Sequence, residues 1–200
     1  RNTNLASTFT VSSWIKTTAT TGTILAKPSA FQFYLSGSKL VANWNNVDQI
    51  TSTTSVNDGL WHYITVSYAA NTANLYIDGV LDRTLTVNIL PNSNRNNFSI
   101  GANWANKVLT NTFIGDIDEV RIWNTALSVD QIRYVMNQEI EKTGISTNGN
   151  TIPFSITKNE IKSVNWANVQ AYYDLNTYYG TSAKDKSDNN RWLRIKYLNI

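Results

Sequence analysis

Hydrophobic and polar residues alternate along much of this chain, and such alternation predicts β-strands with one buried face. The alternation is clearest in Trp61–Ala69. The Asp78-Gly79 pair is a strong hairpin signal, because a type I′ turn needs positive φ at both central positions. The same pattern predicts further strands at residues 9–15, 23–27, 31–35, 39–44, 74–77, 80–87, 98–102, 169–175 and 192–198. Many short strands separated by polar turns indicate an all-β fold.

A short helix is expected after the strand that ends near residue 123. Ser128 and Gln131 have the spacing of a capping box, and Leu127 with Ile132 has the spacing of a hydrophobic staple. This helix should end near Glu139.

A second helix is expected about 30 residues later. Thr157 and Glu160 repeat the capping-box spacing and predict a helix that runs to about Trp166. Residues 141–153, which contain Gly, Asn and Pro, should form a linker between the two helices.

Residues 114–123 carry carboxylates where an alternating strand would place its buried face. Strict alternation puts Asp116 and Asp118 on the same face as the apolar residues that follow them. An ionised carboxylate on an apolar face is unfavourable unless it is hydrogen-bonded, paired with a cation or bound to a metal. One interpretation is therefore a Ca²⁺ site. The other is that Asp118 accepts backbone hydrogen bonds or pairs with Arg121 or Lys16.

Composition narrows the possible classes of protein. The 200 residues suit one all-β domain. Charged residues make up only 16% and the formal net charge is +3, with no basic run typical of nucleic-acid binding. The absence of cysteine excludes disulfides and thiolate sites, and His62 is the only histidine. No segment approaches the roughly 18 apolar residues of a membrane span.

Four segments carry a family resemblance. The most specific is G-D-I-D-E-V-R-I-W-N-T-A-L-S at residues 115–128, and the others are F-T-V-S-S-W-I-K at 9–16, N-D-G-L-W-H-Y at 57–63 and L-Y-I-D-G-V at 75–80. In this order they resemble LamG-like jelly-roll domains of the concanavalin A-like lectin and glucanase superfamily. The resemblance covers roughly residues 5–136. It implies an antiparallel β-sandwich of jelly-roll type, with the two short helices at its edge.

The resemblance also suggests how the chain is organised. Residues 1–140 would form the jelly-roll core, and residues 141–200 a linker, a short helix and strands. Within this tail, residues 169–175 and 183–187 resemble the beginning of such a domain. Either the chain is cut from a tandem array, or this strand folds back and completes the same sandwich. A missing inner strand would leave backbone groups unpaired, which favours the second explanation.

The resemblance implies two kinds of chemistry at residues 116–121. LamG-like domains often bind calcium at the rim of the sandwich, so Asp116 and Asp118 would be metal ligands and Ca²⁺ a structural cofactor. Related glucanases carry Glu-x-Asp-x-x-Glu on one strand, whereas this chain reads D-I-D-E-V-R. We therefore expect no catalytic residues and no enzyme activity, with a glycoside hydrolase as the less favoured alternative.

Two tryptophans lie among asparagines. Trp44 is followed by Asn45 and Asn46, and Asn103 precedes Trp104. A sugar ring stacks its C–H face on an aromatic ring while amide groups bind its hydroxyls, so these five residues are candidates for a ligand site. The alternative is that each tryptophan only packs its loop against the sandwich.

These features favour a non-catalytic binding and adhesion module of a large bacterial cell-surface or secreted protein. We expect it to bind carbohydrate, with Ca²⁺ as a structural cofactor. Its partners would be a glycan or another cell-surface ligand and neighbouring domains of the same polypeptide, without nucleic acid or membrane insertion. The alternative is a spacer repeat that binds nothing. A solvent-facing Trp44 or Trp104 beside a polar hollow would favour binding.

Overall fold

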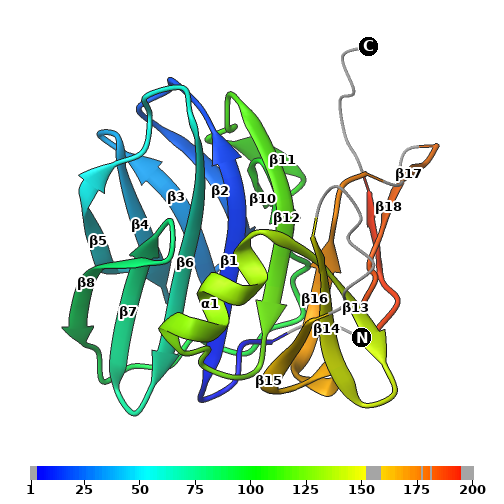
Figure 1. The fold of residues 1–200 in the computed structure, drawn as a ribbon. Helices are drawn as coiled ribbons and strands as arrows, with labels where there is room; N and C mark the ends of the chain where they lie inside the picture. Colours follow the sequence, from blue (N-terminus) through cyan, green and yellow to red (C-terminus); the bar gives the residue numbers. More distant parts are fainter. Residues whose placement is uncertain (1–3, 152–158, 177, 181, 195–200) are drawn as a thin grey trace.

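The computed structural model describes residues 4–151, 159–176, 178–180 and 182–194. Two antiparallel sheets face each other across a hydrophobic interior (Figure 1). The larger sheet has the order β16-β12-β1-β6-β7-β8 and the smaller β5-β4-β3-β2-β9. The larger contains β1 (Phe9–Lys16), β6 (Trp61–Ala69), β7 (Thr72–Ile77), β8 (Val80–Thr86), β12 (Asp116–Trp123) and β16 (Val169–Tyr173). The smaller contains β2 (Gly22–Lys27), β3 (Phe31–Ser36), β4 (Lys39–Trp44), β5 (Val47–Ser55) and β9 (Ser99–Ile100).

Smaller elements surround this sandwich. The helix α1 (Val129–Met136) is followed at a distance by the 3₁₀ turn η1 (Trp166–Asn168). The remaining strands are β10 (Asn103–Ala105), β11 (Val108–Thr110), β13 (Gln138–Thr143), β14 (Ser146–Thr151), β15 (Asn159–Asn165), β17 (Tyr178–Tyr179), β18 (Ser182–Lys184) and β19 (Trp192–Arg194). Within the described residues, no helix is long and apolar enough to cross a membrane.

The alternation in β1 separates the two faces of the larger sheet. Phe9, Val11 and Ile15 point inward and join the main core between the sheets. Trp14 lies on the outer face, where it packs against a second hydrophobic cluster. The predicted all-β antiparallel sandwich is therefore confirmed.

The outer face of the larger sheet is also covered. Figure 1 shows α1 lying across this face, with the β13–β15 sheet beside it. Buried side chains from the strands meet Ile132 and Val135 of α1 and Trp166 of η1 in the second cluster. The central strands of this sheet are thus buried on both faces, which explains how Arg121 of β12 can be completely enclosed.

A β-bulge in β12 changes which side chains face the core. Glu119 has φ +54°, and the register of β12 with β1 shifts at this point. A bulge inserts one extra residue and so reverses the alternation beyond it. Asp118 and Arg121 consequently both lie on the outer face, while Val120 belongs to the core between the sheets. The prediction that Asp116 and Asp118 share a face with Val120 and Ile122 is wrong for this reason.

The first helix agrees with its predicted start. Ser128 is the N-cap of α1, and its side chain and that of Gln131 form the reciprocal capping-box hydrogen bonds. The helix ends at Met136, three residues before the predicted end.

The second predicted helix and the linker are corrected. Thr157 lies outside the described residues, and residues 159–165 form β15. The predicted linker is largely occupied by the β13–β14 hairpin, to which β15 pairs antiparallel. Pairing with a neighbouring strand has overridden the local helix signal, as tertiary context commonly does. In the described residues one α-helix and one 3₁₀ turn replace the two expected helices.

The strand β16 forms one edge of the larger sheet. It runs antiparallel to β12, with Tyr173 opposite Val120 and Tyr172 opposite Arg121. Residues 169–173 therefore contribute to the sheet that also holds β1 and β6. The division of the chain into a core at 1–140 and a tail at 141–200 stays a prediction.

Candidate functional site

A groove lies on the outer face of the larger sheet, where β1, β6 and β12 meet the end of α1 and the start of β13. Its volume is about 470 Å³, within the usual range of small-ligand sites. We call this the outer groove, and it is lined by Trp14, Trp61, Asp118, Glu119, Met136, Asn137, Gln138 and Glu139. The groove thus combines indole rings with carboxylate and amide groups.

The two tryptophans come from adjacent strands. Trp14 lies opposite Tyr63, and Trp61 is two residues before Tyr63, so all three side chains project to the outer face. The Trp14 ring packs on Tyr63 at a centroid distance of 5.3 Å, and its Nε1 donates to the Met136 carbonyl at 2.7 Å. Trp14 is therefore held in place, whereas Trp61 remains 44% exposed. Trp61 is the side chain that presents an aromatic surface to solvent here.

A buried polar network forms the floor of the groove. The Arg121 guanidinium pairs with Glu119 and donates to the Val135 and Gln138 carbonyls. The Tyr172 hydroxyl donates to the same Glu119 carboxylate at 3.0 Å. Because Arg121 contacts α1, β13 and β12 together, it positions the segment that closes the groove.

Asp118 is the half-buried carboxyl of the groove. Its Oδ1 accepts a hydrogen bond from the Glu119 backbone N–H at 2.9 Å. Burial raises the pKa of the Asp118 carboxyl, and the nearby charges of Asp174 and Glu139 add to this effect. The Glu119 N–H and Arg121 act in the opposite direction without cancelling it. A ligand hydroxyl that donates to Asp118 would stabilise the charged form.

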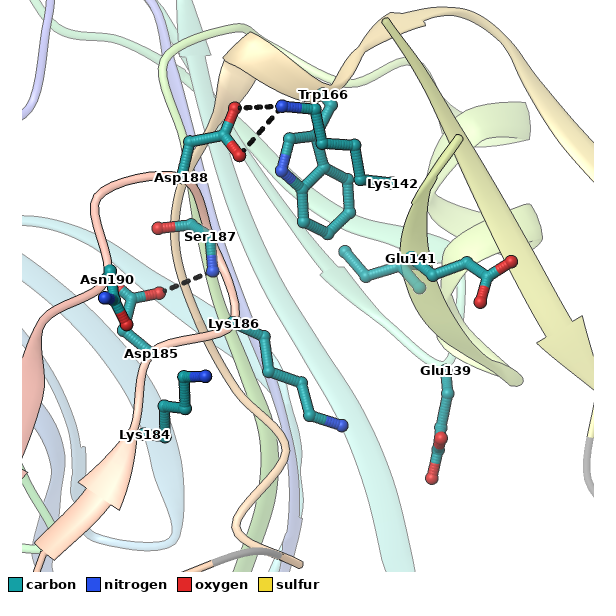
Figure 2. A pocket seen from close by; sticks show the side chains of 11 residues that line it. Glu139, Glu141, Lys142, Trp166, Lys184, Asp185, Lys186, Ser187, Asp188 and Asn190 are labelled. Atoms are coloured by element: carbon teal, nitrogen blue, oxygen red, sulfur yellow. Dashed lines mark hydrogen bonds and ion pairs between the residues drawn. The ribbon is translucent and has the colours of Figure 1, made fainter. Parts of the chain in front are cut away.

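A second hollow lies along β13, with a volume of about 540 Å³. Figure 2 shows it between the β13 strand and the loop at residues 185–190. Its walls carry both signs of charge, and Lys142 and Asp188 form an ion pair at 2.8 Å. Glu139 lines both this second hollow and the outer groove.

The two predicted metal ligands lie on one face of β12. Asp118 lines the outer groove, and Asp116 is exposed at the start of the strand, opposite Lys16. In the described part of the chain, no group of three or more His, Asp or Glu side chains is arranged to hold a metal ion. The calcium site stays a prediction that rests on two carboxylates.

The prediction for Trp44 is corrected, because its side chain is fully buried. Its ring packs against Phe9 and Tyr68, with centroids 5.9 and 5.7 Å away, and its Nε1 donates to the Ile89 carbonyl. Its ring therefore has no face available for a sugar. Asn45 and Asn46 have φ +59° and +63° and form the tight turn between β4 and β5. Asn45 also donates to the Leu90 carbonyl, so this residue connects two loops.

Asn103 and Trp104 are half-buried in the β10–β11 hairpin, where Trp104 lies opposite Leu109. This hairpin follows β9, at the opposite edge of the smaller sheet from the β4–β5 turn. The structure therefore does not bring Trp104 and Trp44 together. A ligand role for Asn103 and Trp104 stays a prediction.

The sequence analysis named neither Trp14 nor Trp61 as a candidate site residue and so missed the outer groove. One signal was available, because Trp14 shares its face of β1 with Thr10 and Ser12 rather than with Phe9 and Val11. A large aromatic residue on the polar face of a strand indicates a covering layer or a binding surface. No local pattern indicated that residues 136–139 would close the groove.

The comparisons with known proteins agree with this fold. A family model described as the concanavalin A-like lectin/glucanases superfamily matches residues 1–133. None of the curated proteins compared with the chain matches it. A candidate carbohydrate-binding protein from Bacteroides ovatus is similar at 16% identity and TM-score 0.67, over 96% of this chain and 54% of that protein. The present chain thus spans about half of that protein's length.

Two further solved structures are similar over about two thirds of this chain. One is the CBM40 of the Ruminococcus gnavus IT-sialidase bound to α2,3-sialyllactose, with 16% identity, TM-score 0.54 and coverage of 63% of this chain and 80% of that one. The other is domain 4 of AbnA, an extracellular GH43 arabinanase from Geobacillus stearothermophilus, in complex with arabinotriose. Its identity is 25%, its TM-score 0.50, and the coverage is 64% of this chain and 66% of that one.

Proposed function

The chain belongs to the concanavalin A-like lectin/glucanase superfamily, and from this membership we propose that it is a non-catalytic carbohydrate-binding module with its ligand in the outer groove. The observation that carries the proposal is the exposed Trp61 beside the half-buried Asp118 in one hollow. Three of the similar structures have carbohydrate binding or a bound saccharide in their descriptions.

The groove offers the two kinds of contact that a sugar needs. The apolar C–H face of a pyranose or furanose ring stacks on the exposed face of Trp61. Its hydroxyls donate to Asp118 and Glu139 and exchange hydrogen bonds with Asn137, which is exposed at the end of α1. A predominantly apolar wall with a few placed polar groups is typical of small-ligand sites.

The way Glu119 is held supports binding without hydrolysis. A glycoside hydrolase needs two available carboxyl groups roughly 5–9.5 Å apart on either side of the scissile bond. Glu119 is instead buried, paired with Arg121 and hydrogen-bonded by Tyr172. The Glu119 carboxylate is held by its contacts with Arg121 and Tyr172, and this supports a binding role for the groove.

We place this module in an extracellular or cell-surface protein of a bacterium, where it contributes to adhesion through glycans. The same context makes neighbouring domains of the same polypeptide its structural partners. Ca²⁺ takes roughly six to eight oxygen ligands. Calcium dependence would rest on Asp116 and Asp118 of β12, and the described residues contain no group of three or more His, Asp or Glu side chains that could hold the ion.

The proposal is tested by replacing Trp61, the exposed aromatic residue of the outer groove. A glycan array identifies bound sugars, and isothermal titration with arabinotriose and α2,3-sialyllactose gives affinities. We expect Trp61→Ala to weaken binding about tenfold or more, equivalent to about 1.4 kcal/mol. The matched control is Tyr134→Ala, because Tyr134 is an exposed aromatic residue of α1 that does not line the groove.

Two results would contradict the proposal. One is the absence of any bound glycan on the array for the wild-type chain. The other is a Trp61→Ala variant that folds normally and binds its sugar as tightly as the Tyr134→Ala control.

A further inference from the structure

The outer groove and the second hollow share Glu139, and the C-terminal part of the chain builds most of the second hollow. We propose that the two hollows form one track for a single oligosaccharide, with the first sugar units at Trp61 and the following units at Trp166 and Asn190. This proposal rests on the proposed function and extends it from a sugar to a chain of sugars.

Charged and polar contacts connect the two hollows. Asn176 donates to the Glu139 carboxylate at 3.4 Å, and this fixes the residue that the hollows share. Asp174 is buried and forms an ion pair with Lys186, which lines the second hollow. The negative charge of Asp174 also helps to raise the pKa of Asp118 in the outer groove. Polar side chains thus lie in both hollows, and Glu139 is the residue they share.

One side chain of the second hollow carries a buried hydrogen-bond donor. Trp166 is 3% exposed, and its Nε1 has no hydrogen-bond partner among the described residues. Figure 2 shows the indole ring with its nitrogen on the side of Ser187 and Asp188. A buried N–H without an acceptor is unfavourable, so a ligand that supplies an acceptor at this point gains that contact.

The charges of the second hollow favour an uncharged ligand. Three lysines and four carboxylates line it, and several of these charges are already held by protein groups. Lys142 pairs with Asp188, Lys186 pairs with Asp174, and Asp185 accepts from three backbone N–H groups. A strongly anionic ligand would have to break these pairs. Neutral hydroxyls can instead donate and accept between them, as a sugar does.

The volumes of the two hollows are compatible with a ligand longer than one sugar unit. Each hollow, at about 470 and about 540 Å³, is by itself within the roughly 300–1,000 Å³ of a drug-sized ligand site. A single ligand that spans both would be a linear chain of several units. The second hollow is built from residues 139–190, which lie beyond the 133 residues that match the family model.

The experiment measures affinity against chain length for the full chain. Isothermal titration uses arabino-oligosaccharides of two to six units, with xylo- and cello-oligosaccharide series in parallel. In the wild type we expect affinity to rise at least tenfold between the shortest and the longest member of the series that binds. The variant Lys184→Ala/Asn190→Ala changes two exposed side chains of the second hollow and should leave the disaccharide affinity unchanged. It should remove the gain for the longer members.

Trp166→Phe provides an independent variant, because it removes the unpartnered N–H while keeping an aromatic ring. It should also weaken the long members selectively. Affinity that is independent of chain length, or a loss in these variants that is equal for two and six units, would overturn the track while leaving Trp61-dependent binding intact. No binding of any series, together with an empty glycan array, would overturn the proposed function itself.

Discussion

His62 lies between two carboxylates at the start of β6. Its Nδ1 is 2.8 Å from Asp78 Oδ2, and its Nε2 is 3.1 Å from Asp58 Oδ1. Burial alone would lower the pKa of His62, but the hydrogen bonds and charges of Asp78 and Asp58 together raise it. The imidazolium therefore connects the loop before β6 to the β7–β8 turn, next to Trp61.

This arrangement predicts that stability depends on pH in one direction. A raised pKa stabilises the fold fully below the unfolded value of about 6.5, and this contribution is lost as pH rises through the folded pKa. We expect the unfolding temperature to fall as the pH rises above about 6.5 and passes through the raised folded pKa of His62. Thermal unfolding of the wild type and of the His62→Asn variant tests this expectation. The variant should lack the part of the pH dependence that comes from His62. Identical pH profiles would contradict the assignment.

At the scale of elements, the entry into β12 depends on a glycine. Gly115 has φ +141°, and a Cβ atom there would lie 2.2 Å from the Lys16 carbonyl oxygen. Lys16 is the last residue of β1, which pairs with β12 at this point. The close approach of the two backbones therefore leaves no space for a side chain.

We expect Gly115→Ala to lower the free energy of unfolding by about 2–4 kcal/mol, since it combines backbone strain with overpacking. The matched control is Gly37→Ala, because Gly37 also has positive φ but has nothing within 4 Å of its would-be Cβ. The free energy of unfolding of the control should fall by only about 1 kcal/mol, because its alanine suffers the backbone strain of a positive φ without any steric clash. Urea unfolding of both variants measures the difference, and equal losses would argue against the close approach.

At the scale of the whole molecule, the Arg121 network joins parts that are far apart in the sequence. Arg121 of β12 contacts the end of α1 and the start of β13, and Glu119 accepts from Tyr172 of β16. Removing the guanidinium leaves the Glu119 carboxylate buried without its cation. Breaking a buried ion pair in this way typically lowers stability by about 3–5 kcal/mol.

We therefore expect Arg121→Lys to be strongly destabilising, although it keeps the charge, because an ammonium group cannot reach three acceptors in a fixed plane. Urea unfolding should show a loss of about 3 kcal/mol or more. The control is Arg83→Lys, whose guanidinium donates to the Thr51 carbonyl at an exposed edge and should change little. A loss for Arg121→Lys no larger than that of the control would contradict the structural role of the network.

The alternation of residues and the turn signals were sufficient to predict most strands of the two main sheets. They depend on local backbone chemistry, such as the alternation in β1 and the Asp78-Gly79 turn. The capping box at Ser128 was predictable for the same reason, since its partners are three residues apart. The family was recognisable because the segments that carry it lie in these strands and turns.

Other features depended on contacts between distant segments. The bulge at Glu119 reverses the face of Asp118, and no pattern within residues 116–123 shows where alternation breaks. Residues 159–165 form a strand because β14 offers it a pairing edge. Trp44 is buried and Trp61 exposed because packing between layers, rather than sequence neighbours, decides which indole is covered. The sequence by itself thus determined the strands, the turns and the family. The tertiary structure alone decided which side chains line the outer groove, because burial depends on residues that are not adjacent in the chain.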